Sequence, residues 1–197
     1  MALARRGYNV TASDGSASMV AEAQRRSRQL GIDINATQSR WQDLSERVAG
    51  EFDLVLCLGN AMVHAETQSG RRSALEGIKK VLRPGGILVI DSRNWELLYE
   101  SRPRIVTAKH VIERDGLRCS SLYIWTVPDD FSEPCRAEVV LLFEDASAAI
   151  THRRHVIDFT PFRHADLTDA IHSTGLTVIG DTYKPDSPFY AVAAAMQ

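Results

Sequence analysis

Two apolar runs in the middle of the chain are each followed by side chains that suit the binding of a small charged molecule. Asn60 and His64 come after the run Phe52–Leu58, and Arg93 comes after the run Ile87–Ile90. The guanidinium of Arg93 is a permanent cation whose planar fork matches a carboxylate in bidentate fashion. The residue types therefore predict a site for a small molecule that carries a carboxylate.

The segments around these residues predict how they are positioned. Phe52–Leu58 is apolar throughout, as expected of a strand buried on both faces of a parallel sheet. Gln68–Leu82 has apolar residues at helical spacing and ends at the sequence Arg-Pro-Gly-Gly. Ile87–Ile90 then predicts a second buried strand. Since the carboxyl ends of parallel strands open on one crevice, the polar residues that follow both strands should lie close together.

The sequences LGNAMVH and LRPGGILVIDSRNWE resemble class I S-adenosylmethionine-dependent methyltransferases, especially the glycine N-methyltransferase and glycine/sarcosine N-methyltransferase family. The LRPGG segment alone is common to that class, whereas its combination with LGN and DxRNW is more specific. The resemblance runs from Leu3 to Tyr99, roughly half of the chain. It implies an α/β, Rossmann-like methyltransferase sheet, S-adenosyl-L-methionine as cofactor, N-methylation of a small amine such as glycine or sarcosine, and a homo-oligomer.

The same resemblance assigns the two predicted catalytic residues. It implies that Arg93, in the DxRN motif, holds the carboxylate of the substrate, and that Asn60 orients the substrate. From the residues alone, Arg93 could instead be a surface arginine paired with Asp91 or Glu96.

Three further residues are assigned to the cofactor. The backbone at Leu58 and Gly59 would border it, and His64 matches a family histidine that contacts its methionine portion. Without the resemblance, His64 would be interpreted as a packing or capping residue.

The N-terminal segment predicts the nucleoside part of the same site. Tyr8–Ala12 is a predicted strand and Ser16–Leu30 a predicted helix with Met19 facing inward. Asp14, between them, can accept hydrogen bonds from both ribose hydroxyls. The alternative is that it caps the helix, and both could hold. Gly15 and Met19 are assigned to the cofactor site with it.

A third predicted strand, Ile32–Ala36, leads to the loop Ser39–Leu44. Trp41 in this loop offers a flat apolar face on which adenine could stack, and Arg40 lies next to it among polar neighbours. The alternative is that Trp41 packs as a lid over the core. Asp43 could equally be a helix cap.

One part of the expected fold has no counterpart in this sequence. The family carries a first strand and a glycine-rich loop before the helix that ends in ALARRGY, whereas here Ala2–Arg6 is already the end of a helix. A central strand is hard to omit, because its neighbours would expose unpaired edges. We therefore predict an N-terminally truncated methyltransferase sheet. The alternative is a non-catalytic binding or assembly protein whose cofactor site is open on one side.

The second half of the chain changes from alternating helices and strands to strands alone. We expect residues 104–158 to form an inserted antiparallel subdomain that covers the substrate, and residues 1–103 and 159–197 to form the methyltransferase domain. The predicted insertion strands, with a turn at Asp115-Gly116, are Ile105–Arg114, Leu117–Val127, Arg136–Phe143 and Ile150–Asp158. A helix, Phe162–Thr174, and two strands, Leu176–Tyr183 and an antiparallel Phe189–Ala195, complete the prediction.

The composition excludes several other functions. The 197 residues are 44% hydrophobic and carry a net charge of -2 with both signs mixed along the chain, which argues against nucleic acid or a membrane surface as partner. No apolar signal core or transmembrane run is present, so we expect a cytoplasmic protein. Three widely spaced cysteines indicate neither a disulfide framework nor a metal site. A nicotinamide-dependent oxidoreductase would share the acidic residue at Asp14, but the last strand and the DSRNW segment argue against it.

Overall fold

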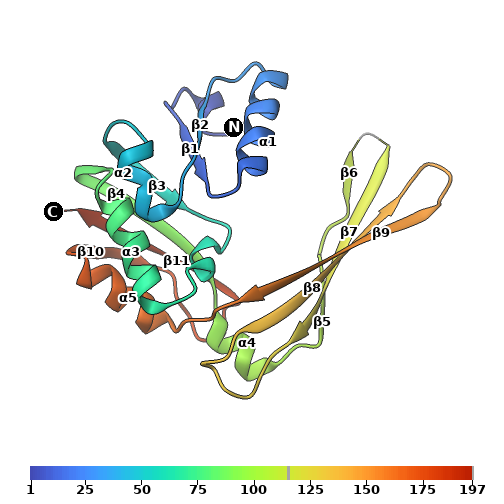
Figure 1. The fold of residues 1–197 in the computed structure, drawn as a ribbon. Coiled ribbons are helices and arrows are strands. Elements are labelled where there is room, and N and C mark those ends of the chain that lie inside the picture. Colours follow the sequence, from blue (N-terminus) through green and yellow to red (C-terminus); the bar gives the residue numbers. More distant parts are fainter. Residues whose placement is uncertain (115, 197) are drawn as a thin grey trace.

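The computed structural model describes residues 1–114 and 116–196 and contains three separate β-sheets (Figure 1). The helices are α1 (Ala17–Gln29), α2 (Leu44–Arg47), α3 (Gln68–Lys79), α4 (Trp95–Ser101) and α5 (His164–Ser173), with short 3-10 turns η1 (Ala4–Arg6), η2 (Trp41–Asp43) and η3 (Ala61–His64). The strands are β1 (Thr11–Asp14), β2 (Asn35–Gln38), β3 (Phe52–Cys57), β4 (Leu82–Arg93), β5 (Ile105–Thr107), β6 (Ile112–Arg114), β7 (Leu117–Thr126), β8 (Cys135–Glu144), β9 (Ile150–Phe159), β10 (Leu176–Asp181) and β11 (Phe189–Met196).

The central sheet has four strands in the order β10-β11-β4-β3. Strands β3 and β4 are parallel, as the strand-helix-strand prediction requires, and α3 lies between them in sequence. Strand β11 runs antiparallel to β4 and β10 and sits between them. The predicted α/β sheet with an antiparallel last strand is confirmed.

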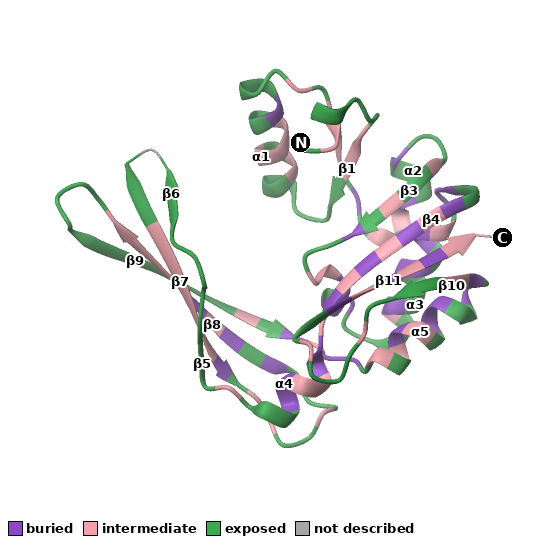
Figure 2. Cartoon of the chain, turned by 180° about the vertical axis from the view of Figure 1, so that it is seen from behind, coloured by how far each residue is buried: buried purple, intermediate pink, exposed green. Residues whose placement is uncertain are grey.

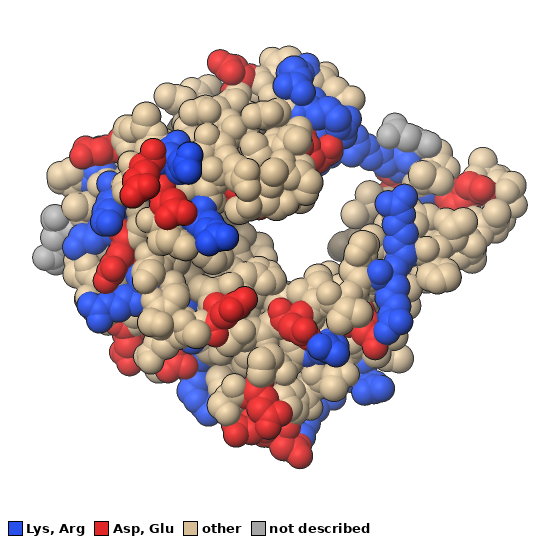
Figure 3. All heavy atoms as spheres, viewed as in Figure 1, with Lys and Arg blue, Asp and Glu red and all other residues tan. Residues whose placement is uncertain are grey.

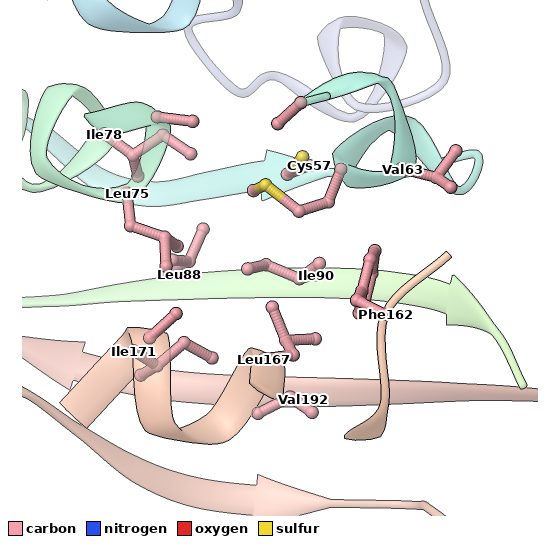
Figure 4. Close-up of a cluster of buried hydrophobic side chains, with 14 of the residues drawn as sticks. Cys57, Val63, Leu75, Ile78, Leu88, Ile90, Phe162, Leu167, Ile171 and Val192 are labelled. Atoms are coloured by element: carbon pink, nitrogen blue, oxygen red, sulfur yellow. The ribbon is translucent and has the colours of Figure 1, made fainter. Parts of the chain in front are cut away.

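Helices α3 and α5 cover one face of this sheet (Figure 4). Leu88 and Ile90 of β4 are fully buried there, against Leu75 of α3 and Leu167 and Ile171 of α5. Because side chains alternate along a strand, the intervening positions of β4, including Arg93, project from the opposite face. The core therefore holds β4 rigidly while its last residue points away from the two helices.

The prediction that Phe52–Leu58 is buried on both faces is wrong. Strand β3 pairs with β4 alone among the described strands, so it is an edge strand. Leu54 and Leu56 are 45% and 39% exposed. An apolar run signals hydrophobic surroundings in general, and it does not reveal whether a strand has one neighbour or two.

Strands β1 and β2 form a parallel pair of their own, beside α1 (Figure 1). Both begin three residues later than predicted, and Asp14 is the last residue of β1 rather than part of a turn. The predicted helix end at Ala2–Arg6 is a 3-10 turn. Met19 was expected to face inward, but its side chain is 56% exposed.

The insertion forms a five-stranded antiparallel sheet, ordered β5-β7-β8-β9 with β6 also on β7. The single predicted strand Ile105–Arg114 is wrong, because the chain bends at Lys109 and His110 and pairs with two separate parts of β7. Asp115 of the predicted turn lies outside the described residues, and Gly116 has the left-handed φ of 76° that hairpin turns favour. Helix α4 was not predicted.

Exposed residues predominate on β6 and on the far half of β9, where the insertion projects from the central sheet (Figure 2).

Within the described part of the chain, no helix is both long and apolar enough to cross a membrane.

Candidate functional site

A cavity of about 900 Å³ lies between the ends of β1 and β2 and the end of β3. Its walls come from the loops that follow β1, β2 and β3 and from parts of β3 and α3, which is the crevice that parallel strand ends create. Six of the predicted cofactor residues line it: Asp14, Gly15, Arg40, Trp41, Leu58 and His64. Met19 and Gly59, predicted for the same site, are not among the lining residues, and Met19 instead faces solvent on α1.

Asp14 closes β1 and supports the turn into α1. Its Oδ1 accepts a hydrogen bond from the backbone N–H of Ser16 at 2.8 Å. Ser16 is the N-cap residue of α1, so the carboxylate stabilises the residue before the helix rather than a free N–H of the first turn. No partner for Oδ2 occurs among the described residues. This leaves one carboxylate oxygen available at the mouth of the cavity.

The position of Trp41 depends on a glycine that the sequence reasoning did not single out. A Cβ at Gly77, in the last turn of α3, would lie 2.0 Å from the carbonyl oxygen of Trp41. Only glycine lets the loop backbone approach the helix this closely. A glycine inside a predicted helix was the available signal, because it weakens a helix without a reason of its own. Gly77 thereby sets the wall of the cavity that carries Trp41.

The polar residues after β3 and β4 form one hydrogen-bonded network. Gly59 and Asn60 both have left-handed backbone, with φ of 80° and 60°. The backbone N–H of Asn60 donates to Asp91 Oδ1 at 2.7 Å, and its side-chain Oδ1 accepts from the backbone N–H of Arg93 at 3.0 Å. Asn60 therefore ties the end of β3 to the end of β4. Its NH2 group has no acceptor among the described residues and remains available to a ligand.

The Arg93 side chain lies outside the cavity and among aromatic rings. Its guanidinium carbon is 5.1 Å from the ring centroid of Trp125 and 4.7 Å from that of Phe189. The surface pairing with Asp91 or Glu96 is wrong, because Asp91 accepts from Asn60 while Glu96 accepts from His164 and Arg163. Burial holds the pKa of Arg93 below its usual value. The described part of the chain thus supplies no carboxylate to this half-buried cation.

A continuous row of rings joins Arg93 to the cavity. Trp125 lies 5.7 Å from Phe159, and Phe159 lies 5.7 Å from His64, measured between ring centroids. His64 lines the cavity, so it borders both regions. We call Arg93, Phe189, Trp125, Phe159 and His64 the Arg93 cluster. No sequence pattern selects Phe159, and the alternation of side chains along a strand does not reveal which face Trp125 occupies.

Asn94, next to Arg93, is a buried structural residue that does not line the cavity. It is 2% exposed, its Oδ1 caps α4 by accepting from the N–H of Leu97, and its NH2 group donates to three carbonyls of the loop before β11. Those carbonyls belong to Lys184, Pro185 and Ser187. Asn94 therefore fixes the segment that leads into Phe189.

One thiol, that of Cys57, also lines the cavity. Burial, with a smaller contribution from the charge of Asp91, raises the pKa of Cys57 to about 12. The thiol is therefore protonated at neutral pH and is a poor nucleophile. The described residues contain no group of three or more His, Cys, Asp or Glu side chains that could hold a metal ion.

Known proteins resemble this chain in sequence and in fold. Residues 1–86 match a family model described as methyltransferase domain. The chain is 39% identical over 98 residues to the glycine/sarcosine N-methyltransferase of Parasynechococcus marenigrum (strain WH8102), an overlap of 50% of this chain and 35% of that protein. It is 24% identical over 198 residues to the glycine/sarcosine N-methyltransferase of Aphanothece halophytica, an overlap of 96% and 68%.

Solved structures extend the likeness across nearly the whole chain. A S-adenosylmethionine-dependent methyltransferase from Clostridium acetobutylicum ATCC 824 superimposes with a TM-score of 0.76 at 13% identity, covering 96% of this chain and 75% of that one. SAM-bound CalS10, an amino pentose methyltransferase from Micromonospora echinaspora, gives 0.72 at 17% identity, covering 96% and 74%.

The fold is therefore that of the class I, Rossmann-like S-adenosylmethionine-dependent methyltransferases, as predicted. Within that class, the resemblance to glycine N-methyltransferases is confirmed, and it includes the enzyme of Rattus norvegicus at 36% identity over 107 residues. The chain spans about a third of the length of each of these relatives: 36% of the Rattus norvegicus enzyme and 35% of the Parasynechococcus protein.

Proposed function

We propose that this chain is a S-adenosylmethionine-dependent N-methyltransferase whose acceptor is a small amine bearing a carboxylate, with glycine or sarcosine as the first candidates. The observation that carries the proposal is the Arg93 guanidinium. It is half buried, has no protein carboxylate among the described residues, and is joined through Phe159 and His64 to the cavity. A desolvated cation that lacks a protein partner favours binding of an anionic ligand group.

The residues of the cavity fit the cofactor. A volume of about 900 Å³ is within the range of sites for ligands of this size. The free oxygen of Asp14 suits the ribose hydroxyls, and the half-buried ring of Trp41 suits the adenine face. Gly15, Arg40, Leu58 and His64 complete the proposed cofactor contacts, whereas Met19 and Gly59 are proposed only as outer neighbours because they do not line the cavity.

The chemistry asked of the protein is mainly positioning. When bound, S-adenosylmethionine supplies an activated methyl group on a sulfonium centre. The protein must hold the amine lone pair in line with that methyl group and close to it, which lowers the entropic part of the barrier. Arg93 would hold the carboxylate, and the NH2 group of Asn60 would orient the acceptor. The only thiol at the cavity wall among the described residues, Cys57, is kept protonated, so we assign it no role as a base.

The named relatives support the choice of acceptor. The Parasynechococcus and Aphanothece proteins are described as glycine/sarcosine N-methyltransferases, and the Rattus norvegicus protein as a glycine N-methyltransferase. We further propose that residues 104–158 act as a subdomain that covers the acceptor, since Trp125 of this segment lies beside Arg93. A homo-oligomer is part of the proposal and is tested by light scattering on the purified protein.

A second candidate is a non-catalytic protein that binds the same cofactor. It is favoured by the exposure of the cavity wall along β3, where Leu56 and Leu58 are 39% and 49% exposed. A methyl donor bound here would be exposed to water on this side and would be held less rigidly. Such a protein would bind the cofactor without turnover.

The test is a methyl-transfer assay with radiolabelled S-adenosylmethionine and three acceptors: glycine, sarcosine and methylamine. Methylamine keeps the amine but lacks the carboxylate. We expect transfer to glycine or sarcosine, little transfer to methylamine, and a loss of about a hundredfold in kcat/KM for Arg93→Ala. Equal transfer to methylamine, or an unaffected Arg93→Ala variant, would contradict the proposed acceptor. Cofactor binding with no transfer to any amine would favour the second candidate.

A further inference from the structure

Two aromatic rings flank Arg93, and they come from two different sheets. Phe189 is the first residue of β11 and stands directly opposite Arg93 in the β4–β11 ladder, so both side chains project from the same face. Trp125 belongs to β7 of the insertion and is 3% exposed, whereas Phe189 is 54% exposed. The guanidinium therefore bridges the central sheet and the insertion, with one buried ring and one exposed ring beside it.

The backbone on both sides of this contact is fixed. The N–H of Arg93 donates to Asn60 Oδ1 at 3.0 Å, and the N–H of Asn94 donates to the carbonyl of Pro188 at 2.9 Å. The three further hydrogen bonds from Asn94 to the loop Lys184–Ser187 hold the segment that leads to Phe189. The backbone on both sides of the Phe189–Arg93 contact is thus anchored through neighbouring asparagines, which keeps the two residues opposite each other.

An arginine side chain has several rotatable bonds, and an isolated one samples many orientations. A ring face attracts the cation and leaves the N–H groups at the edge of the guanidinium free for an anion. The described residues offer this guanidinium no carboxylate, so contacts with the rings set its orientation. The two flanking rings therefore restrict the directions from which a carboxylate can reach the N–H groups.

We propose that Phe189 and Trp125 are positioning residues that hold the Arg93 fork ready for the carboxylate of the acceptor. This inference rests on the proposed function, because it assumes that Arg93 binds that carboxylate. Phe189 is the more informative of the two, since it is exposed and can be changed without opening the core. Removing its ring should leave the cofactor cavity intact and weaken acceptor binding.

The test compares Phe189→Ala with a matched control. Phe143→Ala removes the ring of another arginine pair, since the Arg153 guanidinium carbon is 5.7 Å from the Phe143 ring centroid, and that pair lies on the projecting part of the insertion. For Phe189→Ala we expect the KM of the acceptor to rise about tenfold with the KM of S-adenosylmethionine unchanged. Phe143→Ala should leave both values unchanged. Phe189→Tyr, which keeps the ring, should restore the acceptor KM.

A second measurement does not depend on turnover. The Nε–Hε signal of Arg93 in a ¹⁵N-arginine NMR spectrum, assigned by its loss in Arg93→Lys, should be sharp in the wild type and in Phe143→Ala. It should broaden or move in Phe189→Ala.

The outcomes separate the inference from the function on which it rests. If Arg93→Ala loses activity while Phe189→Ala matches Phe143→Ala in both measurements, the positioning role is wrong and the proposed function stands. If Arg93→Ala is as active as the wild type on glycine and sarcosine, the carboxylate assignment fails and the inference fails with it. If the wild type methylates no carboxylated amine, both are overturned.

Discussion

The cavity proposed for the cofactor and the Arg93 cluster meet at His64, yet they are built differently. The cavity is lined by the loops after β1, β2 and β3 and by parts of β3 and α3, and β1 and β2 form a small sheet that stands beside the central one (Figure 1). The Arg93 cluster is a set of ring contacts between β4, β11 and the insertion, with Trp125 almost fully buried. The cavity is open and polar at its edges, whereas the Arg93 cluster is closely packed.

The difference shows which interactions fix each region. Hydrogen bonds and one glycine contact hold the cavity loops, so single changes there should act on cofactor binding. Aromatic packing holds Arg93, so changes there should act on acceptor binding. In Figure 3, basic and acidic side chains are mixed over the side of the central sheet, whereas basic side chains form a row on the side of the projecting insertion.

The largest effect is expected for Gly77→Ala. Its Cβ would lie 2.0 Å from the carbonyl oxygen of Trp41, so α3 and the Trp41 loop must separate. We expect a loss of about 3 kcal/mol in the free energy of unfolding and no measurable binding of S-adenosylhomocysteine. Denaturant unfolding and calorimetry measure the two. Ser73→Ala, at an exposed position of α3, is the control, and a Gly77→Ala variant as stable as this control would refute the close contact.

Asp14→Asn should affect cofactor binding at the cavity without affecting acceptor binding at the Arg93 cluster. The change keeps the size of the side chain but removes the charge that would hold the ribose hydroxyls. We expect cofactor affinity to fall by about 2 kcal/mol, roughly thirtyfold, with the acceptor KM unchanged. Initial-rate kinetics with each substrate varied in turn measure both values. A rise in the acceptor KM alone would place Asp14 in the wrong region.

The loss of protein stability at alkaline pH allows a buried thiol of the cavity to be compared with one beside the Arg93 cluster. Burial raises the pKa of Cys57, at the cavity, to about 12 and that of Cys135, beside the Arg93 cluster, to about 11. Since the unfolded thiols ionise at a lower pH, near about 8.5, the unfolded state binds fewer protons above that value, and stability falls as pH rises toward the folded pKa values.

Each thiol should lower the free energy of unfolding by about 1.4 kcal/mol at pH 9.5 relative to pH 7.5. Cys57→Ala and Cys135→Ala should each remove one part of this loss, while Cys119→Ala serves as control. Urea unfolding at the two pH values gives the comparison. An equal pH dependence in all four proteins would show that the two thiols are not desolvated as described.

The smallest effect is expected far from both regions. Arg154 and Glu138 form an ion pair across β8 and β9 at 2.7 Å, with Arg154 largely exposed. Glu138→Gln should change the free energy of unfolding by at most about 0.5 kcal/mol and leave both KM values unchanged. Thermal unfolding and the methyl-transfer assay check this. A clear change in acceptor KM would mean that the outer insertion sheet takes part in binding.

The sequence was most informative where local pattern and chain order decide the structure. Gln68–Leu82 predicted α3, and the paired strand ends correctly brought Asp14, Trp41 and His64 to one cavity. The sequence was less informative about which strands and side chains lie next to one another in the fold. The number of strands beside β3, the exposure of Met19 and the division of β5 from β6 depend on long-range pairing, which an apolar pattern does not encode.

The candidate site shows the same limit. Arg93 was selected from its residue type and its place after a strand, but its ring neighbours come from segments 32 or more residues away in sequence. Trp125 lies on an insertion strand, where alternation makes a side chain equally suited to core or solvent, and Phe159 lies one residue beyond the predicted insertion. Gly77 had a local signal, its place inside a helix, but its contact with the Trp41 backbone is visible only in three dimensions.

The most direct test is calorimetric titration of S-adenosylhomocysteine into the wild-type chain, Trp41→Ala and Arg93→Ala. We predict one site per chain in the wild type, clearly weaker binding in Trp41→Ala, and unchanged binding in Arg93→Ala, because Trp41 lines the cavity and Arg93 does not. Absence of binding to the wild type, or equal affinity in all three proteins, would contradict the assignment of this cavity to the methyl donor.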